Sequence, residues 1–83
     1  MNARRKKLLF RTEHCGMKEN DFLLGRFARA NLKILSKEDI AAFEALLMES
    51  DNNIFNWITM KEVPPESHAT PLMAALIAFN TPE

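Results

Sequence analysis

The sequence predicts an all-α fold, a compact bundle of about five short helices in a single domain over residues 1–83. In five segments the apolar residues recur at the three- and four-residue spacing of a helix, and no segment alternates like a strand. Ser, Thr, Gly and Pro residues separate these segments at positions that start or stop helices. A hydrophobic fraction of 47% and a charged fraction of 27% agree with a folded globular chain.

The first two helices are predicted over residues 3–13 and 18–31, with Gly16 as a tight corner and helix stop between them. Cations near the start of the first helix oppose its dipole, so residues 1–3 should fray, as should residues 81–83 at the other end. Gly25, inside the second helix, is explained best by close packing. The expected core contacts of these helices are Leu8, Leu9, Phe10, Leu23, Phe27 and Ala30, with Leu24 and Ala28 beside them.

Three further helices are predicted over residues 37–48, 52–60 and 71–80. Ser36, Ser50 and Thr70 precede them and have side chains that accept hydrogen bonds from first-turn amides. The expected core residues are Ile40, Phe43, Leu47, Leu72, Met73, Leu76 and Ile77, with Leu46 flanking, and Trp57 is expected as a core anchor. The helix over residues 52–60 has apolar residues around most of its circumference (Ile54, Phe55, Trp57 and Ile58), so one side is expected in the core and another exposed to a partner. Met48 and Met60 are also expected to fill the core rather than form a binding groove.

The charge is divided between the two parts of a neutral chain. Residues 1–36 carry a net charge of +6 and residues 37–83 a net charge of −6. One open hypothesis is therefore a nucleic-acid or regulatory binding module that uses a basic patch, made of Arg4, Arg5, Lys6, Lys7 and Arg11. The chain has no nucleic-acid recognition motif to support it, and no apolar run long enough to insert into a membrane.

The stretch from His14 to Phe27 contains most of the candidate chemistry. Cys15 is the only cysteine, which fits a reducing compartment and leaves a redox or acyl-transfer role as a minor hypothesis. His14, Cys15 and the distant His68 are too few for a zinc site. Glu19 and Asp21 lie about 200 degrees apart around a helix, so helix capping or partner contact is favoured over acid–base catalysis.

Three segments together resemble a known family. They are Gly16-Met17-Lys18-Glu19 leading into Asp21 to Phe27, the block from Leu35 to Leu47, and Asp51-Asn52-Asn53-Ile54-Phe55-Asn56-Trp57-Ile58. In this order and spacing, the chain is similar to the small assembly factors of succinate dehydrogenase known as flavinators. The resemblance covers about residues 4–80.

The resemblance implies a five-helix bundle that binds the flavoprotein subunit of succinate dehydrogenase and promotes covalent attachment of FAD to a histidine of that subunit. Fumarate reductase is a second candidate client. FAD then belongs to the client, and the chain itself is expected to have no cofactor, to be no enzyme and to be a monomer when free. Bacterial cytoplasm is the preferred location, with the mitochondrial matrix as the alternative.

The family motif reads Arg-Gly-x-x-Glu, and this chain has Cys15 at the arginine position. Cysteine lacks the guanidinium fork, so another basic residue such as Arg11 is the candidate substitute. The residues that the resemblance implies for partner binding are Arg11, Cys15, Gly16, Met17, Glu19 and Asp21.

Overall fold

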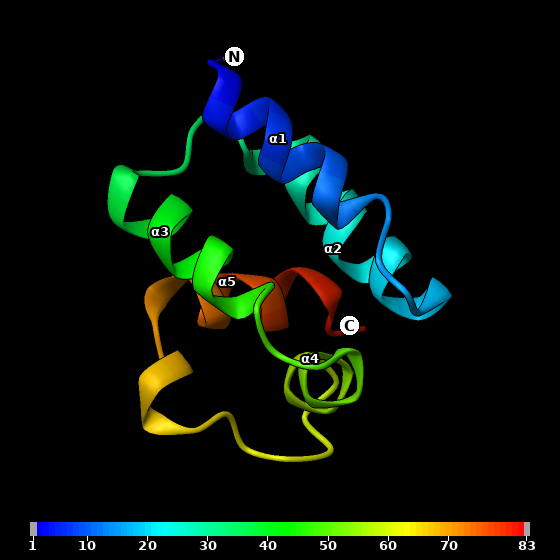
Figure 1. Cartoon of the computed structure of the whole chain (residues 1–83). Coiled ribbons are helices and arrows are strands. Elements are labelled where there is room, and N and C mark those ends of the chain that lie inside the picture. The colour runs from blue at the N-terminus through cyan, green and yellow to red at the C-terminus, as the bar shows by residue number, and fades with distance from the viewer. Residues whose placement is uncertain (1, 83) are drawn as a thin grey trace.

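The computed structural model describes residues 2–82, which form five α-helices and one short 3₁₀ helix, without a strand (Figure 1). The elements are α1 (Ala3–Thr12), α2 (Lys18–Asn31), α3 (Lys37–Leu46), α4 (Asp51–Ile58), η1 (Glu66–His68) and α5 (Pro71–Asn80). The predicted all-α fold of five helices is confirmed, and the bounds of α2 and α5 agree with the prediction. The helices α3 and α4 end two residues earlier than predicted, and η1 was not predicted.

The helix starts follow the predicted caps. The hydroxyl groups of Ser36, Ser50 and Thr70 accept hydrogen bonds of 3.1–3.2 Å from backbone amides three residues later. Asn2 does the same for α1, because its Oδ1 accepts from the amide of Arg5 at 2.9 Å. This cap was not predicted, and it stabilises the turn in which the cations oppose the helix dipole. The fraying expected at residues 1 and 83 lies outside the described residues.

The helices are arranged around α2 and α5. Figure 1 shows α1 and α2 side by side as an antiparallel pair, and α2 also packs against α4 and α5. The helix α5 contacts α3 and α4 as well, so it lies between the two halves of the chain. The buried core is formed by Leu8, Leu24, Phe27, Ala28, Leu32, Ile40, Phe43, Leu46, Ile54, Trp57, Ile58, Leu72, Met73 and Leu76.

Several residues that were predicted to lie in the core are exposed or half-buried, and a neighbouring residue is buried instead. Phe10 is 61% exposed and stacks on the ring of His14 with 4.0 Å between centroids, so its predicted core role is wrong. Ala30 is exposed. At the end of α3 Leu46 is fully buried, whereas Leu47 is only half-buried. The centre of the predicted apolar stripe was therefore wrong on α1, α2 and α3, whereas on α5 the predicted residues Leu72, Met73 and Leu76 are buried.

The methionines divide between core and surface. Met73 is buried as expected, whereas Met48 and Met60 are exposed and do not fill the core. Met60 has a φ of 62°, in the left-handed region, because the chain turns sharply after α4. Trp57 is buried as predicted. No helix within residues 2–82 combines the length and the apolar character needed to cross a membrane.

Candidate functional site

The loop between α1 and α2 forms a corner that is fixed by its own side chains. Oδ1 of Asp21 accepts a hydrogen bond from the backbone amide of Cys15. The thiol of Cys15 lies 3.5 Å from the carbonyl oxygen of Arg11, in the direction of a weak donor. Met17 is half-buried and precedes α2 without a side-chain cap. Asp21 therefore stabilises the conformation of the corner by binding the backbone amide of Cys15.

Gly16 is needed for close approach and not for an unusual backbone conformation. Its φ is not in the left-handed region, so the prediction of a glycine-specific helix stop is wrong. A Cβ atom added to Gly16 would lie 2.8 Å from Oδ2 of Asp51, the first residue of α4. Asn20 is fully buried beside this contact, and its Nδ2 donates to the carbonyl oxygen of Asp51 at 2.9 Å. These contacts join the corner to the start of α4.

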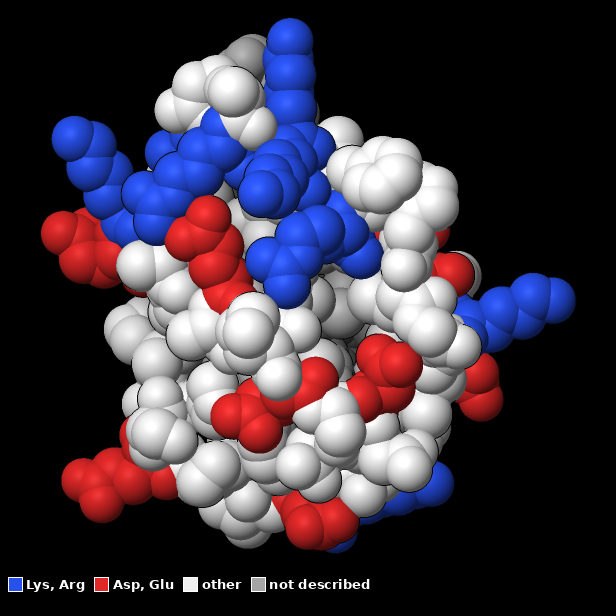
Figure 2. All heavy atoms as spheres, viewed as in Figure 1, with Lys and Arg blue, Asp and Glu red and all other residues white. Residues whose placement is uncertain are grey.

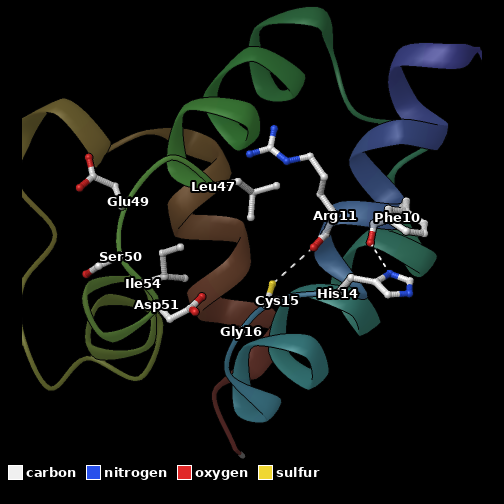
Figure 3. Close-up of a pocket in the computed structure, with 10 residues that line it drawn as sticks. All are labelled: Phe10, Arg11, His14, Cys15, Gly16, Leu47, Glu49, Ser50, Asp51 and Ile54. Carbon is white, nitrogen blue, oxygen red and sulfur yellow. Dashed lines mark hydrogen bonds between the residues drawn. The ribbon is translucent and has the colours of Figure 1, made fainter.

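A hollow of about 390 Å³ opens beside the corner (Figure 3). Helix α1 and the corner form one wall, and the connection from α3 to α4 with the first turn of α4 forms the other. We call this the corner hollow; its lining residues are Phe10, Arg11, His14, Cys15, Gly16, Leu47, Glu49, Ser50, Asp51 and Ile54. It combines apolar walls with charged groups of both signs, which suits a protein side chain better than a purely apolar ligand.

Arg11 is the cation that faces the corner hollow. In Figure 3 its guanidinium extends across the hollow toward Leu47, whereas His14 turns back to the carbonyl oxygen of Phe10. Within residues 2–82 Arg11 has no ion pair, and its side-chain contact is a distance of 4.0 Å to the sulfur of Met48. An unpaired guanidinium at the edge of a hollow is suited to bind a carboxylate.

Cys15 is a poor nucleophile in this position. Burial, together with the nearby carboxylates of Asp21 and Asp51, raises the pKa of its thiol to about 11, against a smaller opposing effect of Arg11. The thiol is therefore protonated at neutral pH, which argues against the redox or acyl-transfer hypothesis. Among residues 2–82 no three His, Cys, Asp or Glu side chains are grouped so that they could hold a metal ion.

A second concave surface lies on the other side of the first turn of α2. It is an apolar groove of about 440 Å³ between α2 and α4, lined by Lys18, Glu19, Phe22, Leu23, Phe55 and Thr59. We call it the α2–α4 groove. The groove itself was not predicted, although one apolar side of the helix over residues 52–60 was expected to face a partner. Phe22 gave a second signal, since it is a large apolar residue outside the inner face of α2.

The structure places four of the six predicted site residues on these two surfaces, whereas Met17 and Asp21 line neither of them. Arg11, Cys15 and Gly16 are brought together in the corner hollow. Glu19 is exposed and lines the α2–α4 groove instead. The first turn of α2 therefore separates a polar hollow from an apolar groove.

The basic patch of the alternative hypothesis is partly neutralised within the fold. Figure 2 shows Lys and Arg side chains gathered over α1, with Asp and Glu side chains below them. Arg4 pairs with Glu44 at 2.6 Å, which raises the pKa of Arg4 and lowers that of Glu44. Arg5 donates to the carbonyl oxygen of Leu32. Two of the five proposed nucleic-acid contacts are therefore already engaged.

Comparison with known proteins decides between the hypotheses. The family described as flavinator of succinate dehydrogenase matches residues 6–80 of this chain. The chain belongs to the succinate dehydrogenase flavinator family. The predicted family is confirmed, and nothing in the comparisons favours a nucleic-acid module.

The relatives of this chain include mitochondrial and bacterial proteins. It is 42% identical over 69 residues to the mitochondrial succinate dehydrogenase assembly factor 2 of Dictyostelium discoideum, which covers 83% of this chain and 49% of the relative. It is 33% identical over 75 residues to the FAD assembly factor SdhE of Acetobacter pasteurianus, covering 90% of this chain and 69% of the relative. The chain thus spans about half the length of the Dictyostelium relative.

Proposed function

We propose that this chain binds the flavoprotein subunit of succinate dehydrogenase and promotes covalent attachment of FAD to that subunit, with fumarate reductase as a second candidate client. The observation that carries this proposal is the family match over residues 6–80, nearly the whole chain. The names of the relatives, which are assembly factors, support it. One of these relatives is named as mitochondrial and the other is bacterial, so both proposed locations, the bacterial cytoplasm and the mitochondrial matrix, stay open.

The proposed mechanism is stabilisation of a client conformation and not catalysis by this chain. A binding protein raises the rate of a reaction within its client when it binds more tightly to the state in which the reacting groups are aligned. The client's histidine and the flavin ring are those groups. The protonated thiol of Cys15 supports this non-enzymatic role, because it removes the strongest nucleophile near the corner. The chain acts as a monomer in this scheme.

The corner hollow is the proposed contact surface, and Arg11 is its main charged anchor. The guanidinium of Arg11 reaches the hollow from α1 and takes the place of the arginine that the resemblance expects at Cys15. A carboxylate of the flavoprotein subunit would bind to it, with apolar atoms against Leu47 and Ile54. Gly16 leaves the backbone open to close contact.

The remaining residues of the predicted set have different proposed roles. Glu19 is exposed in the first turn of α2 and accepts hydrogen bonds from the partner. Met17 adds apolar contact beside it. Asp21 acts indirectly, since it holds the amide of Cys15 and so keeps the corner in shape.

Co-expression with a matching flavoprotein subunit tests the proposal. Covalent flavin is measured by fluorescence of the subunit in a denaturing gel, with and without this chain. We expect a clear increase with the wild-type chain and a smaller one with Arg11→Ala. The matched control is Lys33→Ala, which removes an exposed cation at the far end of α2. Equal covalent flavin with and without the wild-type chain would refute the proposed function.

A further inference from the structure

We infer that the α2–α4 groove is a second docking site, which takes an apolar segment of the flavoprotein subunit bordered by acidic side chains. This inference rests on the proposed function and extends the contact surface beyond the corner hollow. It concerns residues outside the family motif, chiefly Phe22 and Phe55.

The groove exposes aromatic surface that the core does not use. Phe22 is 58% exposed, and Phe55 and Leu23 are half-buried along the same groove. The volume of about 440 Å³ is enough for several apolar side chains of a partner. Covering these residues would remove apolar area from water, which is the main driving force of protein association.

The charges around the groove indicate the character of the occupant. Lys18 lines the groove, the guanidinium of Arg26 lies 4.8 Å from the centre of the Phe22 ring, and Nζ of Lys61 lies 4.9 Å from the centre of the Phe55 ring. Within residues 2–82 none of these three cations has an ion pair. Glu19 is the one acidic residue among the lining residues that the structure describes, and the three cations outnumber it. The occupant that complements this border carries carboxylates beside its apolar residues.

The groove is continuous with the proposed contact surface. Glu19 lines it and lies in the same short stretch as Gly16, which lines the corner hollow. A partner that covers the first turn of α2 therefore reaches both surfaces. This continuity favours the flavoprotein subunit over a second copy of the chain as the occupant.

Substitution of Phe22 provides the test, with the purified flavoprotein subunit as the probe. Phe22→Asp should weaken binding about tenfold or more, because it places a charge in the apolar contact and adds a carboxylate among the cations. The matched control is Ile34→Asp, since Ile34 is 79% exposed and lies away from both surfaces. The control should change the affinity less than twofold. Circular dichroism establishes that both variants keep wild-type helicity.

A charge reversal gives a second arm that does not depend on Phe22. Lys61→Glu should weaken binding several-fold and reduce its salt dependence, whereas Lys33→Glu should do neither. If the wild-type chain binds the subunit but each variant loses no more affinity than its control, the groove inference is overturned. Sedimentation measures whether the wild-type chain self-associates. If Phe22→Asp abolishes self-association and leaves binding of the flavoprotein subunit unchanged, the groove binds a second copy of the chain and the groove inference is overturned. If the wild-type chain itself does not bind the subunit, the proposed function fails and the groove inference fails with it.

Discussion

Gly16 and Asp51 approach each other so closely that a Cβ atom on Gly16 would lie 2.8 Å from Oδ2 of Asp51. We therefore expect Gly16→Ala to cost about 1 kcal/mol of unfolding free energy, because the carboxylate must move away from its position beside Asn20. The cost stays moderate because only the end of one side chain has to shift. Chemical denaturation of the wild type and the variant measures it.

A double-mutant cycle isolates this contact from other effects of alanine. In an Asp51→Ala background, Gly16→Ala should be close to neutral or slightly stabilising, since the close contact is gone. An equal cost in both backgrounds would show that Gly16 is needed for a reason other than Asp51.

Gly25 has more room than Gly16 and should tolerate alanine. An added Cβ would lie 3.3 Å from Nη1 of Arg29 and 3.8 Å from the carbonyl oxygen of Thr12 on α1. Alanine favours a helix by about 1 kcal/mol over glycine, and moving the exposed end of Arg29 costs less than that. Gly25→Ala should thus raise stability by about 0.5 kcal/mol, and Gly25→Leu should lower it by about 2 kcal/mol or more through contact with α1. A loss for the alanine variant would contradict this account.

The raised pKa of Cys15 predicts slow alkylation and a specific pH dependence. Iodoacetamide at pH 7 should modify the folded chain far more slowly than the denatured chain, because little thiolate is present. The folded chain keeps the thiol proton at pH values where the unfolded chain loses it, so unfolding releases a proton there. Stability should therefore fall as the pH rises from about 9 to about 11. Cys15→Ser should lack this part of the pH dependence, and an identical profile would contradict the assigned burial.

His68 should stabilise the loop that joins α4 to α5. It is buried, its Nε2 lies 2.8 Å from Oε2 of Glu49, and its ring lies 5.3 Å from that of Trp57. His68→Ala should lower the free energy of unfolding by about 2 kcal/mol. It should also change the fluorescence emission of Trp57, which is the only tryptophan of the chain. The exposed His14 is the matched control, and His14→Ala should cost less than about 0.5 kcal/mol. Similar costs would show that the contact with Glu49 contributes little.

The fold could be predicted because its signals are local. Ser36, Ser50 and Thr70 begin helices by bonding amides three residues away, so neighbouring residues were enough to locate them. On α1 and α3 the stripe could be found but not centred, because contacts with distant helices decide that Phe10 is exposed and that Leu46 is buried. The 3₁₀ helix η1 has no comparable signal in its three residues.

The site was predicted less completely because it depends on distant pairs. The contact of Gly16 with Asp51 joins positions 35 residues apart in number, and no local pattern indicates it. Arg11 could be proposed from its charge, but its direction into the corner hollow is set by the packing of α1 on α2. The α2–α4 groove exists only after these helices pack, so Phe22 and Phe55 could not be paired in advance.

The rate of covalent flavin attachment in a purified system tests the central claim most directly. Apo-flavoprotein subunit and FAD are mixed, and covalent flavin is followed by in-gel fluorescence with no addition, with this chain, or with its Glu19→Ala variant. We expect a large increase in rate with the wild-type chain and a smaller one with the variant, although the variant keeps wild-type helicity. An unchanged rate in the presence of saturating, folded wild-type chain would contradict the central claim.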